Sequence, residues 1–256
     1  MKNICLLLII ALTSSCSLLS VFKSEPLVFN YVENQDYIDH LAATGREYLI
    51  SEEKNKIKSD EDVKKYLEEL HERIISSNQS LLTGKDKPEF SFIKHKTPFM
   101  FSLPKSQYFF SSGLLERFLK SEEVFIAALS SEILKSHRFI YEKKLFLPTG
   151  VYGTEKMLKL TRLKFEEKVQ VNEWTYYILK RARFDATAYL NWIQIQSRNT
   201  LEFAMYIDDP TSLTREEQQY KNFISKQGVF GIGKKINEAN SSKIFYKLLN
   251  NIARTK

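Results

Sequence analysis

The sequence predicts an α+β fold that is mostly helical, with a small sheet towards its N-terminal side. Two features carry this prediction. Long segments before residue 80 and after residue 120 repeat apolar residues at the spacing of one helix face. Between them, residues 89–111 contain short aromatic-rich segments separated by breaks such as Pro104, which are typical of strands and turns.

The helices before the sheet are expected at about residues 34–50 and 59–77. Ser59 is placed to cap the second helix, and acidic residues in its first turn favour the positive end of the helix dipole. The apolar residues of this helix form one stripe that a core can bury. The stripe contains Val63, Tyr66, Leu67, Leu70, Ile74 and Ile75.

The sheet is expected after a break at residues 84–88, where glycine and proline interrupt the chain. Three aromatic-rich strands are predicted, with a turn at Pro104 between the second and the third. A short helix at residues 113–120 follows them. The strands are expected at residues 89–94, 99–103 and 107–111.

The next helix begins after Ser121, which is expected to cap it, and two glutamates occupy its first turn. Its first part is apolar almost all round, so we expect a central, buried helix. Residues 154–168 are predicted to form a basic helix and residues 172–192 a long aromatic-rich one. Two or three further helices are expected within residues 198–256, with a break at Gly231-Ile232-Gly233.

The start of the chain has the layout of an export signal that ends in a lipid-modified cysteine. Lys2 gives a positive start, residues 4–12 form an apolar run, and three small residues lead to Cys16. The run is shorter than the roughly 20 apolar residues that span a bilayer, and no later stretch is long enough. We therefore expect a lipoprotein with a signal peptide at 1–15, a lipid-anchored tether at 16–30 and one domain at 31–256.

Cysteine content and charge agree with export. Cys5 leaves with the signal, so the mature chain keeps only Cys16 and forms no internal disulfide, which an oxidising compartment does not require. Removing Lys2 from the net charge of +7 leaves about +6, typical of a solvated surface or mild attraction to anionic lipid. Export excludes nucleic acid as the partner. Ser17 follows the lipid cysteine directly. In hosts with two membranes, a serine at this position resembles lipoproteins that are sent to the outer membrane, where they face the periplasm.

One alternative to the lipid anchor stays open, namely an ordinary signal with a chance cysteine. Leu12 lies four residues before Cys16, and Thr13 stands where Leu is commoner in lipoprotein signals. The small residues that follow Thr13 satisfy either kind of cleavage site. Both alternatives predict export, and they differ in whether the mature chain is held on a membrane.

Four blocks in the middle of the chain carry a resemblance to a known family. They are Pro98-Phe99-Met100-Phe101-Ser102-Leu103-Pro104, Tyr108-Phe109-Phe110-Ser111-Ser112-Gly113-Leu114-Leu115, Ser121-Glu122-Glu123 and Ala127-Ala128-Leu129-Ser130-Ser131-Glu132-Ile133. Their order and spacing are similar to those of the HtpX-like zinc metallopeptidases, metallopeptidase family forty-eight, which includes the CAAX prenyl proteases. The resemblance covers about residues 60–190 and implies a gluzincin-like metallopeptidase domain with a central zinc helix.

In that family a His-Glu-x-x-His motif on the central helix binds one zinc through its two histidines, because residues at i and i+4 share a helix face. The glutamate is the general base that acts on the zinc-bound water, and a later helix supplies a third ligand. The resemblance places the three ligand positions at Ser131, Lys135 and Arg181. It places the general base at Glu132 and the aspartate of the third-ligand motif at Asp185.

Each of the three ligand positions is therefore replaced. Serine is a poor ligand, and lysine and arginine are cations at neutral pH that repel zinc and offer no free lone pair. We expect no metal and no cofactor, and a former metal cleft in which Lys135 and Arg181 compensate the charges of Glu132 and Asp185. No i, i+4 pair occurs among the four histidines, His40, His71, His95 and His137.

The expected function is that of a pseudoenzyme, a non-catalytic peptide- or protein-binding or assembly factor at the cell envelope. A partner is expected along the strand edge from Phe99 to Leu103, because extended peptides add to such edges. Three other hypotheses stay open. They are an active zinc metalloendopeptidase with misaligned ligands or a rebuilt site of Glu132, His137 and Asp185; a Ser131–Lys135 nucleophile pair; and a purely structural envelope lipoprotein.

Overall fold

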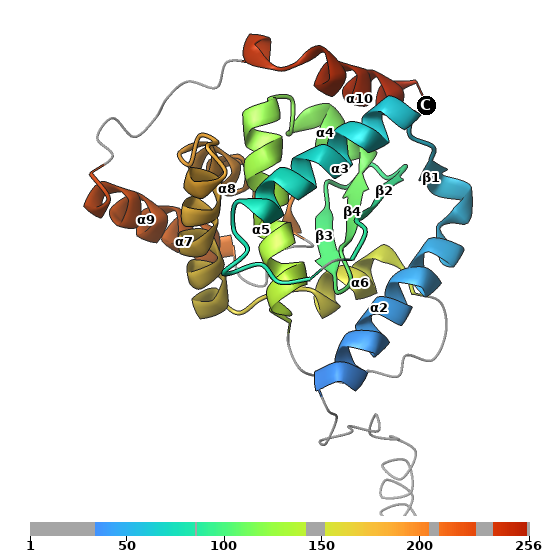
Figure 1. Cartoon of the computed structure of the whole chain (residues 1–256), viewed down its shortest axis with the longest axis horizontal. Helices are drawn as coiled ribbons and strands as arrows, with labels where there is room; N and C mark the ends of the chain where they lie inside the picture. Colours follow the sequence, from blue (N-terminus) through green and yellow to red (C-terminus); the bar gives the residue numbers. More distant parts are fainter. Residues whose placement is uncertain (1–33, 85, 142–151, 205–209, 229–237, 255–256) are drawn as a thin grey trace, which may run out of the picture.

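A computed structural model describes residues 34–84, 86–141, 152–204, 210–228 and 238–254. Within these residues the predicted α+β, mostly helical fold is confirmed (Figure 1). The helices are α2 (Asn34–Ser51), α3 (Glu61–Ser76), α4 (Ser112–Arg117), α5 (Glu122–Arg138), α6 (Thr154–Leu160), α7 (Phe165–Arg181), α8 (Ala188–Arg198), α9 (Pro210–Lys226) and α10 (Lys243–Ala253).

The sheet of the described residues has four strands in the order β1-β2-β4-β3. The three predicted strands are confirmed as β2 (Glu89–Ile93), β3 (Met100–Leu103) and β4 (Gln107–Ser111). β3 and β4 are antiparallel, and β4 runs parallel to β2. The additional strand β1 (Lys56–Ile57) pairs antiparallel with β2 and is too short for a sequence pattern to predict.

Alternate side chains of a strand point to opposite faces of the sheet. Here the strands carry apolar side chains on both faces, and helices cover both. One face packs on α3 and α5 through Phe92, Met100, Tyr108 and Phe110. The other face packs on α2 and α6 through Ile93, Phe101, Leu103 and Phe109. On this second face, Tyr48 of α2 meets the rings of Phe101 and Phe109 edge-on, with centroid distances of 5.5 and 5.6 Å.

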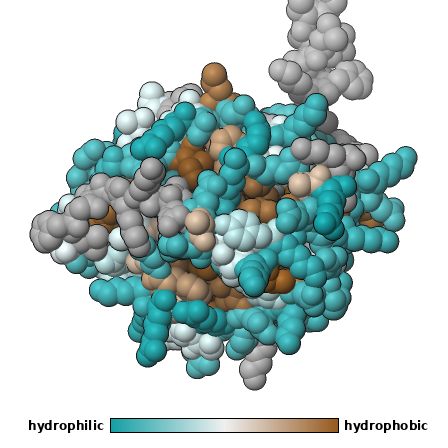
Figure 2. All heavy atoms as spheres, turned by 90° about the horizontal axis from the view of Figure 1, so that it is seen from above, coloured by the Kyte–Doolittle hydropathy of each residue, from teal (hydrophilic) through white to brown (hydrophobic). Residues whose placement is uncertain are grey.

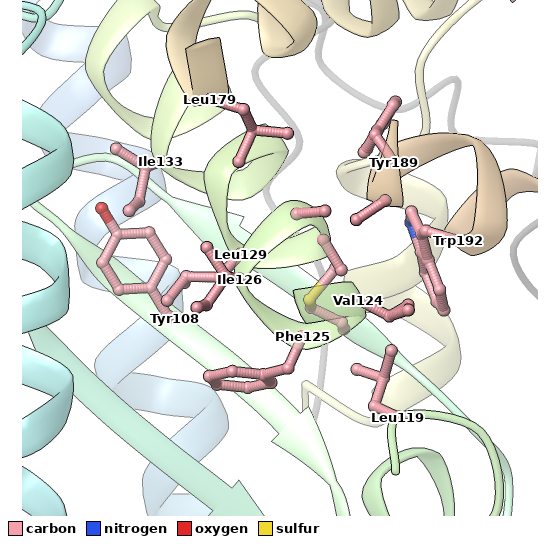
Figure 3. Packing of buried hydrophobic residues seen from close by; sticks show 14 of the residues in the cluster. Tyr108, Leu119, Val124, Phe125, Ile126, Leu129, Ile133, Leu179, Tyr189 and Trp192 are labelled. Carbon is pink, nitrogen blue, oxygen red and sulfur yellow. The ribbon is translucent and has the colours of Figure 1, made fainter. Parts of the chain in front are cut away.

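α5 is the central helix that its apolar sequence predicts. It packs against β3, α3, α7 and α8, and it is buried from Val124 to Leu134. Figure 3 shows Ile126 and Leu129 of α5 on the side of Tyr108, whereas Tyr189 and Trp192 of α8 lie on the other side. Side chains of α5 are therefore enclosed by protein on several sides, and a polar group placed there needs a partner.

The start of α5 falls directly after Ser121, as predicted, but the side chain of Ser121 does not hold it there. Ser121 occupies the N-cap position, but its side chain makes no cap hydrogen bond. Instead, the Glu122 carboxylate accepts hydrogen bonds from the main-chain N–H and the hydroxyl of Ser242 at 2.6 and 2.9 Å. The hydroxyl of Tyr66 donates to the same carboxylate at 2.6 Å.

The start of α3 also differs from the prediction that Ser59 caps it. The helix begins at Glu61, with Asp60 in the N-cap position and no side-chain cap hydrogen bond. Lys247 of α10 contacts the carboxylates of Asp62 and Asp60 at 2.7 and 3.5 Å. A cation from a distant helix thus engages acidic residues that the sequence pattern assigned to the positive end of the helix dipole.

Two further predicted helices have different boundaries in the structure. Residues 154–168 do not form one helix: α6 ends at Leu160, and α7 starts at Phe165. The new start is stabilised because Glu167 accepts a hydrogen bond from the main-chain N–H of Lys164 at 3.0 Å, the geometry of a helix N-terminus. α4 likewise ends at Arg117, three residues before its predicted end.

The predicted long helix at residues 172–192 is interrupted between α7 and α8. Arg183 adopts a left-handed conformation with φ of 58°, and Asp185 accepts hydrogen bonds from the main-chain N–H and hydroxyl of Thr187. The guanidinium of Arg73 on α3 donates to the main-chain oxygens of Ala182 and Arg183. These contacts stabilise an end for α7 that helical periodicity does not reveal.

The signal peptide, Cys5, Cys16, the tether and the Gly231-Ile232-Gly233 break lie outside the described residues. Among those that are described, no helix has the length and apolar character needed to cross a membrane. Figure 2 shows that hydrophilic side chains cover most of one face, with apolar side chains between them.

Candidate functional site

The central feature of the site is a buried ion pair on α5. Lys135 follows Glu132 by three residues, so both side chains lie on neighbouring positions of one helix face. The ammonium nitrogen of Lys135 lies 2.6 Å from Oε1 of Glu132, and the two side chains are only 12% and 4% exposed. The predicted contact between these residues is therefore present, and it is shielded from water.

Ser131 is the third residue of this helix segment to which the resemblance assigns a role. Its hydroxyl donates a hydrogen bond to the main-chain oxygen of Ala128 at 2.7 Å. The ammonium of Lys135 is engaged by Glu132, and a protonated amine has no lone pair with which to accept a proton. The geometry therefore does not support a Ser131–Lys135 nucleophile pair.

Glu132 and Lys135 line a pocket of about 80 Å³ between α5, β3 and the helices of the second half. The pocket is lined by five apolar residues and ten polar or charged ones. The apolar ones are Met100, Leu158, Leu163, Val171 and Trp192. The other lining residues are Ser131, Glu132, Lys135, Thr161, Arg162, Lys168, Asn172, Tyr189, Gln196 and Glu216.

A chain of hydrogen bonds among three of these lining residues links three helices. The hydroxyl of Tyr189 on α8 donates to Oδ1 of Asn172 on α7 at 2.8 Å. The amide nitrogen of Asn172 donates to Oε1 of Glu216 on α9 at 2.8 Å. Burial, together with the negative charges of Glu216 and Glu132, raises the pKa of the Tyr189 hydroxyl well above its usual value. Tyr189 is therefore neutral near neutral pH and can act as a hydrogen-bond donor.

Asn172, Tyr189 and Glu216 are site residues that the sequence did not reveal. Asn172 and Tyr189 fall within one predicted helix, where nothing distinguishes them from structural polar residues. Glu216 lies 44 residues after Asn172, on a helix whose start was not predicted. The relevant signal is spatial, since these side chains are buried together only when α7, α8 and α9 pack.

Arg181 and Asp185 lie apart from the pocket that Glu132 lines, contrary to the expectation that they share its cleft. The guanidinium of Arg181 is exposed and donates to the hydroxyl of Ser80 at 3.0 Å. Asp185 accepts hydrogen bonds from Thr187 in the turn between α7 and α8. Because α7 ends at Arg181, the charge compensation of the pocket falls to Lys135 and not to Arg181.

The residues at the family's metal positions do not fit zinc. The ammonium of Lys135 occupies one oxygen of Glu132, Ser131 donates its proton to the main chain, and Arg181 points elsewhere. In the part of the chain that the structure describes, no group of three or more His, Cys, Asp or Glu residues has the geometry to hold a metal ion. No reaction step through a metal is therefore derived for this pocket.

His137, offered above as a ligand in a rebuilt site, belongs to a different cluster at the end of α5. Its Nδ1 donates to the main-chain oxygen of Thr83 at 3.0 Å, so its Nε2 accepts from the hydroxyl of Ser106 at 3.2 Å. His71 of α3 lies beside it, with ring centroids 5.6 Å apart, and its Nε2 contacts the Tyr108 hydroxyl at 3.1 Å. Both ring nitrogens of His137 are thus engaged within the protein.

The strand edge to which the sequence assigns a partner belongs to β3. Its four residues are at most 1% exposed. Met100, at its start, lines the same pocket as Glu132. The hydroxyl of Ser102 lies 3.5 Å from that of Tyr141. A peptide added at this edge would have to displace the groups that cover it.

Comparisons with known proteins leave the family open. No protein-family model matches the chain, and no curated protein matches it either.

Proposed function

We propose that the protein is an exported cell-envelope lipoprotein, held on a membrane by lipid at Cys16, that binds a protein or peptide and does not hydrolyse it. Its domain is proposed to be a gluzincin-like metallopeptidase domain that has lost its zinc. One observation carries the proposal: the ammonium of Lys135 contacts the Glu132 carboxylate where the family has its second histidine. A cation that belongs to the chain thus takes the place of the metal charge.

The physical chemistry of the pocket supports a loss of catalysis. A glutamate acts as general base in such peptidases by polarising a metal-bound water. Here one oxygen of the Glu132 carboxylate lies 2.6 Å from a lysine ammonium, so a cation of the chain itself occupies the side of the carboxylate that would face a metal-bound water. The hydroxyl of Ser131 donates to the main chain, and the guanidinium of Arg181 donates to Ser80 outside the pocket. Neither side chain is therefore placed to bind zinc.

The order of elements supports the proposed domain type. A hairpin of β3 and β4 leads through the short helix α4 to the buried helix α5, which bears Glu132. This order agrees with the order of the blocks that carry the resemblance. The proposed binding surface is the region of the Glu132 pocket and the adjacent edge from Phe99 to Leu103, because Met100 belongs to both. Binding at this edge would require the bound peptide to displace the groups that cover it.

The test uses the mature chain and an unfolded protein such as casein, with and without added zinc. We expect casein to bind and to stay intact in both conditions. Cleavage that a chelator stops, and that Glu132→Gln abolishes, would favour the active metalloendopeptidase instead. Neither binding nor cleavage would favour the purely structural lipoprotein.

A further inference from the structure

A groove of about 1100 Å³ lies between α3 and the loop that leads to β2. Glu68, His71, Glu72 and Ile75 of α3 line it, and their spacing of three and four residues places them on one helix face. Residues 79, 82–84 and 86–88 of the loop form the facing wall. The groove shares no lining residue with the Glu132 pocket, so it is a separate surface.

The loop wall is fixed against the end of α5. The main-chain oxygen of Thr83 accepts a hydrogen bond from Nδ1 of His137 at 3.0 Å. Gly84 has a φ of 135°, and a Cβ there would lie 3.2 Å from Nδ1 of His137 and 4.0 Å from Oδ2 of Asp86. The negative charge of Asp86 also acts on the hydroxyl of Tyr108. The carboxylate of Asp86 therefore faces the inner side of the groove.

His71 brings a polar atom to the base of this groove. The residue is only 4% exposed, and its Nε2 lies 3.1 Å from the hydroxyl of Tyr108. Its Nδ1 makes no hydrogen bond with a described residue, and it is not among the fully enclosed polar atoms that lack a partner. Since His71 lines the groove, this nitrogen is open to it.

The hydrogen bonds around Tyr108 make Nδ1 of His71 an acceptor. Burial, with a smaller effect of His137, lowers the pKa of His71 to about 3, so its neutral ring carries one N–H. Ser106 donates to His137, and Ser136 donates to the main chain, so both hydroxyls can only accept from Tyr108. Tyr108 therefore donates to a serine and accepts from Nε2 of His71, which leaves the lone pair on Nδ1.

Three acceptors thus line the groove without a donor from the described part of the chain. They are Nδ1 of His71 and the carboxylates of Glu72 and Asp86, which form no hydrogen bond or ion pair with described residues. The two carboxylates are exposed and individually attract a cation only weakly. A buried ring nitrogen between them favours a ligand that brings several N–H groups.

The two cations that line the groove are engaged elsewhere. Lys87 contacts the carboxylate of Glu68 at 3.1 Å. The guanidinium of Arg73 donates to the main-chain oxygen of Ala182 at 2.9 Å and lies over the ring of Phe184 at 4.0 Å. Both positive charges are therefore directed away from His71. Lys85 lies outside the described residues and is not part of the site.

The remaining lining residues accommodate an aliphatic chain. Ile75, Leu82 and Pro88 belong to the two walls, and Leu82 is 2% exposed. A long cationic side chain can lay its methylene groups on such a surface while its charged head meets acceptors. Arginine suits these acceptors better than lysine, because its planar group has five donors and is more weakly hydrated.

We propose that this groove binds an arginine side chain of a partner protein or peptide. The guanidinium donates to Nδ1 of His71 and to the carboxylates of Glu72 and Asp86, and the aliphatic part packs on Leu82. The inference goes beyond the proposed function, because it assigns a second binding surface that involves neither Glu132 nor the former zinc positions.

Four blocked pentapeptides test the proposal, with one central residue exchanged between otherwise identical alanine sequences. The central residue is arginine, its neutral isostere citrulline, lysine or glutamate. Binding to the mature chain is followed in ¹H–¹⁵N spectra. We expect the arginine peptide to bind with a Kd of about 1 mM and to shift the amides of residues 68–75, and the citrulline and glutamate peptides to bind at least about tenfold more weakly.

A matched pair of variants isolates the nitrogen of His71. In His71→Gln the side-chain amide reaches the position of Nε2, so the contact with Tyr108 is kept and the acceptor at Nδ1 is lost. In His71→Asn the amide oxygen can take the position of Nδ1. Loss of a hydrogen bond to a charged group should weaken the arginine peptide about tenfold in His71→Gln, and less in His71→Asn.

Two further variants address the carboxylates. Glu72→Gln should weaken the arginine peptide about threefold, because its carboxylate is exposed. Glu72→Arg places a guanidinium of the chain in the groove and should abolish binding, and this exposed position serves if the His71 variants do not fold. Glu61→Gln, which is 86% exposed at the start of α3, is the control and should leave binding unchanged.

The proposal is overturned if the arginine peptide does not bind at about 10 mM, if citrulline replaces arginine without loss, or if the shifted amides lie outside the groove. Unchanged binding in Glu72→Arg would overturn it as well. These outcomes leave the proposed function untouched, because zinc content and casein binding are measured independently of this groove.

Discussion

The ammonium of Lys135 lies 2.6 Å from the carboxylate of Glu132, one helical turn away on α5 and almost entirely shielded from water. The same kind of pair occurs on α6, where Lys159 and Glu155 are 2.8 Å apart but 63% and 66% exposed. The two pairs differ strongly in burial, and Glu155 and Lys159 are four residues apart where Glu132 and Lys135 are three. Comparing their coupling energies therefore separates the contribution of the buried site from that of an exposed ion pair on a helix.

A double-mutant cycle on Glu132→Gln and Lys135→Met measures the buried pair. Removing one partner of a buried pair leaves an uncompensated charge, so each single variant should lower the free energy of unfolding by about 3 kcal/mol. The coupling energy should lie well above about 1 kcal/mol in urea unfolding. The cycle on Glu155→Gln and Lys159→Met should give only about 0.3–0.5 kcal/mol. Equal, small couplings in both cycles would show that the pocket is open to water.

The His71–His137 cluster predicts a dependence of stability on pH. Burial, together with the neighbouring His137, lowers the pKa of His71 from 6.5 to about 3. A base with a lowered pKa in the folded state binds its proton more readily when unfolded. Its contribution to stability is therefore complete above pH 6.5, declines as the pH falls, and is gone below about pH 3. Between pH 7 and pH 5 the loss is about 2 kcal/mol.

Urea unfolding at pH 7 and pH 5 checks this prediction. His71→Gln should remove most of the difference between the two pH values, because the titrating group is absent. His95→Gln, on the loop between β2 and β3, is the matched control and should keep the difference. A difference that His71→Gln leaves intact would assign the acid sensitivity to other groups.

Lipid attachment at Cys16 predicts that Cys16→Ala changes both the mass and the location of the protein. Without the thiol no diacylglyceryl group can be attached, so the variant should be released from membranes or stay unprocessed. Membrane fractionation and mass spectrometry of the intact protein measure the two effects. Unchanged retention together with an unchanged mass would contradict the anchor.

The features that local sequence could predict are those set by periodicity and spacing. The three strands, the buried character of α5 and the contact of Lys135 with Glu132 follow from residues close to one another in the chain. Ser59 does not cap α3, and Ser121 occupies the predicted N-cap of α5 without a side-chain cap hydrogen bond. The acidic residues at these helix starts are engaged instead by Lys247 of α10 and by Ser242 just before α10.

The features that could not be predicted depend on contacts between distant segments. Arg73 of α3 stabilises the end of α7, and this end separates Arg181 and Asp185 from Glu132. The hydrogen bond between Asn172 and Glu216 forms only when α7 meets α9. The alignment of the motif by spacing alone therefore placed Arg181 in the cleft of Glu132. In the folded protein Arg181 lies outside that cleft.

The most direct test of the central claim, that the zinc site has been lost, is the metal content of the mature chain. The protein is purified without chelators from cells supplied with zinc, and bound metals are measured by mass spectrometry. The account predicts zinc far below one per chain, and no change in melting temperature when a chelator is added. About one zinc per chain, with a melting temperature that falls on chelation, would contradict it.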